Sequence, residues 1–194
     1  GTSGERIEII TKSSRAKFRI SGRFNYGDSR LNARNPFVNE KTPTNFYEPS
    51  FNLSGPISDK TSWIFYSELT NRKSEVAINA ITLNSLNQPT IFKSFQTTAI
   101  KRRFASYRID ANPSDKLKIS LSYSFQTTTT KNLGIGGFSL PSRAYSTTDQ
   151  THGIRFNTVY VFNPNIFNSA KGAIVFIKNK TQSFGNEVGV NVLD

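Results

Sequence analysis

The sequence predicts an all-β protein, specifically an antiparallel transmembrane β-barrel segment, and two patterns support this prediction. Segments of about ten residues alternate apolar and polar side chains, which is the period of a strand with one apolar face. The connectors between these segments are alternately very short and long. Outer-membrane barrels have this asymmetry, because their periplasmic turns are short and their extracellular loops are long.

Seven strands are expected in the order of the chain. They cover 18–26, 47–55, 62–70, 104–111, 117–126, 154–160 and 170–178. Short turns are expected at 58–60, 112–115 and 163–165, and long loops at 27–45, 71–100 and 127–151. Pro49 has no amide hydrogen to donate to a neighbouring strand, so we expect a local break or bulge there.

Most of these strands have one apolar and one polar face. The alternation is clearest in the fifth strand, where the apolar positions are Leu117, Ile119, Leu121, Tyr123 and Phe125. In a membrane barrel the apolar face contacts lipid and the polar face lines the lumen. The charged residues expected to face the lumen are Arg19, Arg23, Glu48, Glu68, Arg108, Lys118 and Arg155.

Aromatic residues gather where strands meet connectors, as expected of two interfacial girdles. Those near the short turns are Trp63, Tyr107, Phe162 and Phe167, and those near the long loops are Tyr26, Phe46, Tyr47, Tyr123 and Phe125. The alternation itself also fits a soluble sheet that is half covered by a protein core. A soluble or surface-exposed antiparallel β-sheet protein, such as an adhesin or a carbohydrate-binding sandwich, is therefore the alternative.

The composition narrows the class of protein. There is no Cys, which excludes disulfides and thiolate chemistry, and there is no apolar run of about 18 residues that could form a transmembrane helix. The net charge of +12 suggests nucleic-acid binding, but Lys and Arg are spread over the whole chain without an RNA-binding strand motif. Nucleic acid is therefore not an expected partner. The basic residues are expected to line a wet interior and the loops, where lipopolysaccharide phosphates are available.

No enzyme and no cofactor are indicated. His152 is the only histidine, and no cluster of carboxylates accompanies it, so neither a metal site nor a catalytic triad can be assembled. The Gly-rich stretch 134–137 lacks the spacing of a dinucleotide-binding loop and is expected to be a flexible loop tip. The sequence thus predicts no catalytic, cofactor-binding or metal-binding residues.

The number of strands and the absence of Met indicate a piece of a longer protein. Bacterial single-chain barrels have an even number of strands, at least about eight, whereas seven are expected here. An open sheet in lipid would leave the backbone groups of two edges without partners.

Four motifs in order resemble the TonB-dependent outer-membrane receptors, in the Oar-like or carboxypeptidase-regulatory-like branch. The motifs are GERIEIITKS at 4–13, KFRISG at 17–22 with DSRLNARNPF at 28–37, FNLSGPI at 51–57, and NAITL at 79–83. The resemblance implies that 1–14 is the C-terminal end of a plug domain and 15–194 the N-terminal part of a barrel of about 22 strands. It also implies the outer membrane of a Gram-negative bacterium, with outer-membrane lipid and lipopolysaccharide as surroundings.

The same resemblance implies active uptake of a large or scarce solute, which the sequence does not identify. TonB would contact a segment upstream of this chain. The expected loops 71–100 and 127–151 would form part of a ligand vestibule, with Lys101, Arg102 and Arg103 as contacts for an anionic group or, alternatively, as a solvated strand entrance. Surface attachment or protein secretion is the rival function.

Overall fold

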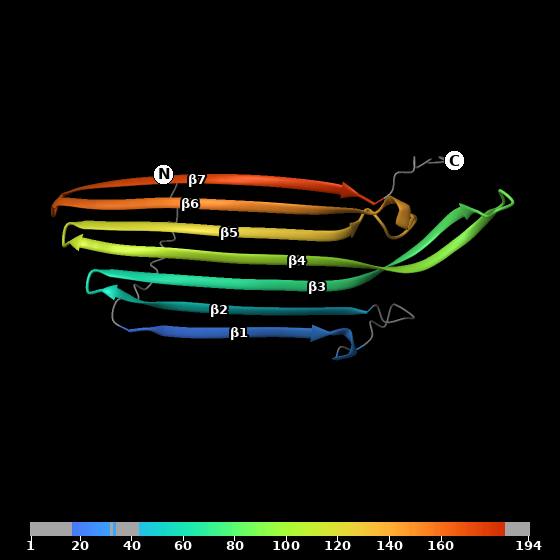
Figure 1. Cartoon of the computed structure of the whole chain (residues 1–194), viewed down its shortest axis with the longest axis horizontal. Coiled ribbons are helices and arrows are strands. Elements are labelled where there is room, and N and C mark those ends of the chain that lie inside the picture. The colour runs from blue at the N-terminus through green and yellow to red at the C-terminus, as the bar shows by residue number, and fades with distance from the viewer. Residues whose placement is uncertain (1–16, 32, 34–42, 185–194) are drawn as a thin grey trace, which may run out of the picture.

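The computed structural model describes residues 17–31, 33 and 43–184, so the expected end of a plug domain at 1–14 lies outside them. The described residues form one antiparallel sheet of seven strands, each paired with the next along the chain (Figure 1). The strands are β1 Arg19–Asp28, β2 Thr44–Ser58, β3 Thr61–Leu83, β4 Pro89–Ser114, β5 Leu117–Leu133, β6 Tyr145–Asn163 and β7 Ile166–Ser183. The predicted all-β antiparallel architecture is confirmed. Within the described residues β1 does not pair with β7, so the sheet is not closed.

Three tight connections lie together at one end of the sheet, as predicted, and we call this the turn end. They join β2 to β3, β4 to β5 and β6 to β7, on the left in Figure 1. The Ser58 hydroxyl accepts the amide of Lys60 at 3.3 Å, and the Asn163 side chain accepts the amide of Asn165 at 3.0 Å. Short polar side chains of this kind favour turns because they bond to the backbone two residues ahead.

The expectation of a long loop at 71–100 is wrong, because β3 and β4 stay paired through most of this segment. This hairpin closes at Asn84, whose side-chain oxygen accepts two backbone amides within the turn, each at 2.9 Å. Apolar residues in this segment occupy both faces, for example Ile78 and Ile81, so it lacks the one-sided alternation of the other strands. Backbone pairing needs only extended residues and does not require one apolar face.

The expected loop 127–151 is also too long. β5 continues to Leu133 and β6 begins at Tyr145, which leaves the connection 134–144. Residues 127–130 are four consecutive threonines, which are polar but β-branched and therefore suited to strands. We call the end of the sheet that carries this connection the loop end.

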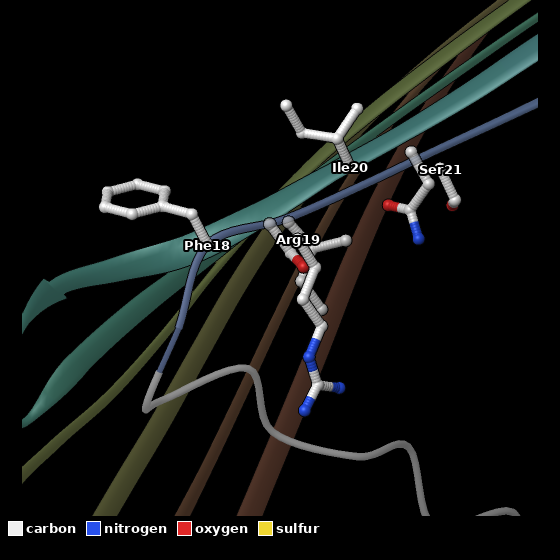
Figure 2. A pocket seen from close by; sticks show the side chains of 7 residues that line it. Phe18, Arg19, Ile20 and Ser21 are labelled. Carbon is white, nitrogen blue, oxygen red and sulfur yellow. The ribbon is translucent and has the colours of Figure 1, made fainter.

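The register confirms the expected alternation of faces across the whole sheet. One row that crosses all seven strands consists of Ile20, Leu53, Phe65, Tyr107, Tyr123, Ile154 and Ile174. We call the face that carries this row the apolar face, and the opposite one the polar face. Figure 2 shows the alternation at the start of β1, where Ile20 and the preceding residue Phe18 lie on one side of the ribbon and Arg19 on the other.

The break expected at Pro49 is present, but there is no bulge. Pairing between β2 and β3 stops after Tyr47 and resumes at Ser50 with the register unchanged.

The sheet is a single layer with almost no core of its own. The buried hydrophobic residues of the described part are Ile78, Ala80 and Ala144. On the apolar face Ile20 is 81% and Phe24 67% exposed. Because a large bare apolar surface is unfavourable in water, another layer has to cover this face, made either of protein or of lipid.

Candidate functional site: the polar face and the loop end

All seven charged residues expected to line a lumen lie on the polar face. They are Arg19, Arg23, Glu48, Glu68, Arg108, Lys118 and Arg155. Arg19, Arg108 and Arg155 share one row across the sheet, and Arg23 and Glu68 share another. The structure thus brings them to a common surface, while their role in a lumen remains a prediction.

A hydrogen-bonded cluster lies on the polar face near the turn end. Arg108 donates to Asp110 Oδ1 from Nε at 2.8 Å and lies within 2.7 Å of it through Nη2, and it also donates to Ser120 Oγ at 3.2 Å. The Ser120 hydroxyl donates to Asp110 as well. Ser62 and Asn157 share the row of Asp110 and Ser120, and Ser62 Oγ and Asn157 Oδ1 are buried without a partner among the described residues. Such atoms need polar neighbours, so this face is suited to a wet or polar environment.

A second polar group surrounds Tyr66. Its hydroxyl donates to the Glu68 carboxylate, and its ring lies 5.9 Å from that of Phe104, centroid to centroid. A hollow of about 270 Å³ beside it is lined by Ser21, Gly22, Arg23, Ser50, Phe51, Asn52 and Tyr66. An aromatic ring among hydroxyl, amide and guanidinium groups can bind a polar ligand by stacking and hydrogen bonding.

The larger hollow, of about 600 Å³, does not lie on one face, and the smaller one also reaches Gly22 and Phe51 of the apolar face. The larger one is lined by Phe18, Arg19, Ile20, Ser21, Asn52, Ser54 and Ile64. Since Phe18 and Ile20 lie on the side of β1 opposite to Arg19 (Figure 2), the hollow wraps around the edge of β1. We interpret it as the edge of the sheet and not as a ligand cavity.

The connection 134–144 docks on β3 beyond the point where β2 ends. The Gly137 amide donates to the Ala77 carbonyl at 2.9 Å, and the Asn79 amide donates to the Gly137 carbonyl at 2.7 Å. Gly136 and Gly137 have φ values of 112° and 59°, which L-residues rarely adopt. This Gly-rich stretch, expected to be a flexible tip, is therefore tied to the sheet by two backbone hydrogen bonds.

The same connection crosses the polar face of the sheet. Ile78 and Ala80 lie on that face and are each 2% exposed, whereas Ile81 on the apolar face is 75% exposed. An added Cβ at Gly136 would contact Val76, which shares the polar face. The connection 134–144, which joins β5 to β6, thus narrows the space above the polar face at the loop end. Local sequence patterns cannot reveal this arrangement.

Lys101, Arg102 and Arg103 do not form one patch. They lie inside β4, so their side chains alternate between the two faces. Arg102 lies on the polar face and donates to Gln126 at 3.1 Å, while Lys101 and Arg103 lie on the apolar face. A contact with a ligand on the polar face therefore remains a prediction for Arg102 alone.

The apolar face carries a band without Lys, Arg, Asp or Glu. Its residues are the alternate positions within 18–26, 47–55, 63–69, 105–111, 117–125, 152–160 and 170–176. At the loop end the band stops at Tyr26 in β1 and at Phe176 in β7. The row of Tyr26 crosses β7 at Lys180, so the border in β7 lies four residues closer to the turn end. At about 3.3 Å per residue and 4.8 Å per strand, this border is inclined by roughly 25° to the rows. An inclined border is expected where strands are tilted relative to a membrane plane.

Aromatic side chains meet at both borders of the band. Near the turn end the rings of Tyr160 and Phe162 have centroids 4.7 Å apart. Tyr107, which was expected near this end, stacks on Trp63 but pairs directly with Tyr123, so it lies closer to the loop-end border. Near the loop end Tyr123 Oη lies 2.8 Å from His152 Nδ1, and the His152 ring lies 4.9 Å from that of Phe125. The single histidine thus belongs to this aromatic border.

Two residues expected in the girdles lie on the polar face instead. Phe46 pairs with Arg72, whose guanidinium carbon lies 5.4 Å from the centre of its ring, and Phe167 pairs with Val161. Both expectations failed because proximity to a connector does not determine the face, which depends on register.

The ion pair between Asp28 and Arg30 at the loop end of β1 lowers the pKa of Asp28. Asp28 accepts hydrogen bonds from the Arg30 side chain at 3.0 Å, from its backbone amide at 2.8 Å and from Tyr26 at 3.2 Å. The side-chain hydrogen bond from Arg30, followed by the backbone one, holds the pKa of the Asp28 carboxyl well below its ordinary value.

No group of three His, Cys, Asp or Glu side chains that could hold a metal ion occurs among the described residues. Within the same residues no helix is long and apolar enough to cross a membrane.

Comparison with known proteins finds no matching family model, no matching curated protein and no matching solved structure.

Proposed function

We propose that this chain is part of the wall of an outer-membrane β-barrel of the TonB-dependent receptor type, which takes up a large or scarce solute. The observation that supports this most directly is the uncharged band on the apolar face of a single-layer sheet. Lipid would cover this band without any second protein layer, and the polar face would line the lumen.

A soluble sandwich explains the band less well. Its inner face would need a second sheet of similar area, whereas all seven described strands lie in one layer. The inclined border and its aromatic residues also favour a membrane. The soluble adhesin or carbohydrate-binding protein therefore remains the second candidate.

The uptake role rests on the resemblance together with two features of the polar face. The groups around Arg108 and Tyr66 offer hydrogen bonds to a plug or to a passing solute. The connection 134–144 would narrow the outer mouth above them. Energy would come from TonB through a segment upstream of this chain.

Uptake assays with a strain that lacks the complete gene test this proposal. We expect slower growth or uptake on at least one member of a panel of siderophores, glycans and peptides, restored by the intact gene. Unchanged uptake of every compound, together with lost adhesion or lost protein export, would favour the rival function.

A further inference from the structure

The charged residues of the apolar face gather immediately above the uncharged band. At the loop end this face carries seven cations, of which six lie in three successive rows and are called the basic belt: Lys73, Lys101, Arg103, Lys131, Lys178 and Lys180. The seventh, Lys93, lies farther out in β4. Arg103 and Lys178 share one row across the sheet, Lys101 and Lys180 the next, and Lys73 and Lys131 the third. Residues far apart in sequence therefore lie on one face of the sheet, on β3, β4 and β5 and, beyond β6, on β7 (Figure 1).

The belt is not neutralised within the described part of the chain. All six residues are exposed, and none forms an ion pair with a described residue. Asp28 and Glu75 are the acids on this face among the described strand residues, and Asp28 already pairs with Arg30. Like charges on neighbouring strands repel each other, so folding alone gives no reason to gather these cations.

The position of the belt distinguishes it from a generally basic surface. The described strand residues of the apolar face carry no Lys or Arg from the turn end up to the border of the band. The cations begin directly after the last apolar residues, as with Ala105 followed by Arg103, and Phe176 followed by Lys178. In a membrane this is the level of the lipid headgroups, on the side expected to face outward.

We propose that the basic belt binds the phosphate groups of lipopolysaccharide in the outer leaflet. This inference rests on the proposed membrane location and adds to it the surface that would bind the lipid phosphates. The acyl chains of the lipid would lie against the uncharged band, while its phosphates meet Arg103 and Lys178 and then Lys101 and Lys180. Arginine and lysine both donate charge-assisted hydrogen bonds to phosphate oxygens.

The test uses the complete protein, purified in detergent, and measures bound lipid by native mass spectrometry. The probes are lipid A with two phosphates, enzymatically dephosphorylated lipid A, and inorganic phosphate alone. The belt variant is K101Q/R103Q/K178Q/K180Q. Its matched control, K17Q/K60Q/K116Q/K171Q, removes the same charge from exposed positions that lie off the apolar face or outside the described strands.

We expect the belt variant to bind phosphorylated lipid A at least about 100-fold more weakly, at roughly fivefold for each cation. The control should change by less than about threefold, and K101R/R103K/K178R/K180R, which keeps every charge, should bind like the wild type. Dephosphorylated lipid A and inorganic phosphate should both bind much more weakly than phosphorylated lipid A. If the belt variant does not insert, the milder K178Q/K180Q variant gives the same comparison with an expected loss of about 25-fold.

Equal binding by the belt variant and the wild type would overturn the inference, as would inorganic phosphate binding as tightly as lipid A. Insertion of the wild type into lipid vesicles is measured in parallel. Failure to insert would contradict the proposed function itself, whereas insertion without belt-dependent binding would contradict the lipid inference alone.

Discussion

At the scale of single residues, the alternation of faces decides which substitutions the protein tolerates. Leu121 lies in the middle of the uncharged band, and its neighbours across the strands are Ile109 and Phe156. We expect Leu121→Arg to lower the free energy of unfolding by about 2–4 kcal/mol in a bilayer, because the charge would face lipid near the midplane. Urea titration of the protein in vesicles measures this change.

The matched control for this substitution is Ser124→Arg. Ser124 lies on the polar face opposite Ser106 and Gly153, so the new charge meets no other cation across the strands. Ser120 is a poorer control because it bonds to Arg108 and Asp110. The control should cost less than about 1 kcal/mol, and equal losses at the two positions would show that the assigned faces are wrong.

The lowered pKa of Asp28 also has a measurable consequence. A carboxyl whose pKa falls on folding contributes stability above its unfolded value, and this contribution is lost as the pH falls through the folded value. We expect Arg30→Gln to raise the pKa of Asp28 toward 3.8 without reaching it, because the backbone amide of residue 30 still donates. NMR titration of the carboxyl carbon measures the shift. An unchanged pKa would show that Arg30 is not its main cause.

At the scale of elements, β3 and β4 are longer than the roughly 9–11 residues that a membrane-spanning strand would need. Each continues well past the border of the uncharged band, and the far part of β3 has no β2 beside it. The connection 134–144 supplies two backbone bonds there and covers Ile78. The hairpin and the connection therefore support each other above the polar face.

We expect Gly137→Val to detach this connection, because a β-branched residue is strained at a φ of 59°. Hydrogen exchange of the Asn79 amide, which donates to Gly137, should become at least about fivefold faster, since it would lose about 1–2 kcal/mol of protection. Gly172→Ala is the control, since Gly172 has ordinary φ and open space around its Cα. Unchanged exchange at Asn79 would mean that the connection is not held by this contact.

At the scale of the whole molecule, the two ends of the sheet should face opposite sides of a membrane. The 194 residues contain no cysteine, so a label on a single introduced cysteine reports on that position alone within this chain. In intact cells we expect a membrane-impermeant maleimide to label Leu86→Cys and Phe138→Cys at the loop end. It should label Asp59→Cys and Asp115→Cys at the turn end only after the outer membrane is opened. The reverse pattern would invert the proposed topology.

Local sequence patterns were enough to predict the seven strands, the faces of their central residues and the tight turns, because these depend on local period and on turn residues. Leu117 to Phe125 alternate so clearly that only one assignment of faces was possible, and Ser58 and Asn163 bond to their own turns. Polar but extended segments, such as residues 127–130, were misinterpreted because composition does not reveal a pairing partner.

Only the tertiary structure decided what depends on register between distant strands. It separated Lys101 and Arg103 from Arg102, and it placed Arg103 in one row with Lys178, which lies three strands away in β7. It also brought Gly137 to the edge of β3. A shift of one residue would exchange the faces of a strand, so such neighbours are set by the pairing of the whole sheet and not by any one segment.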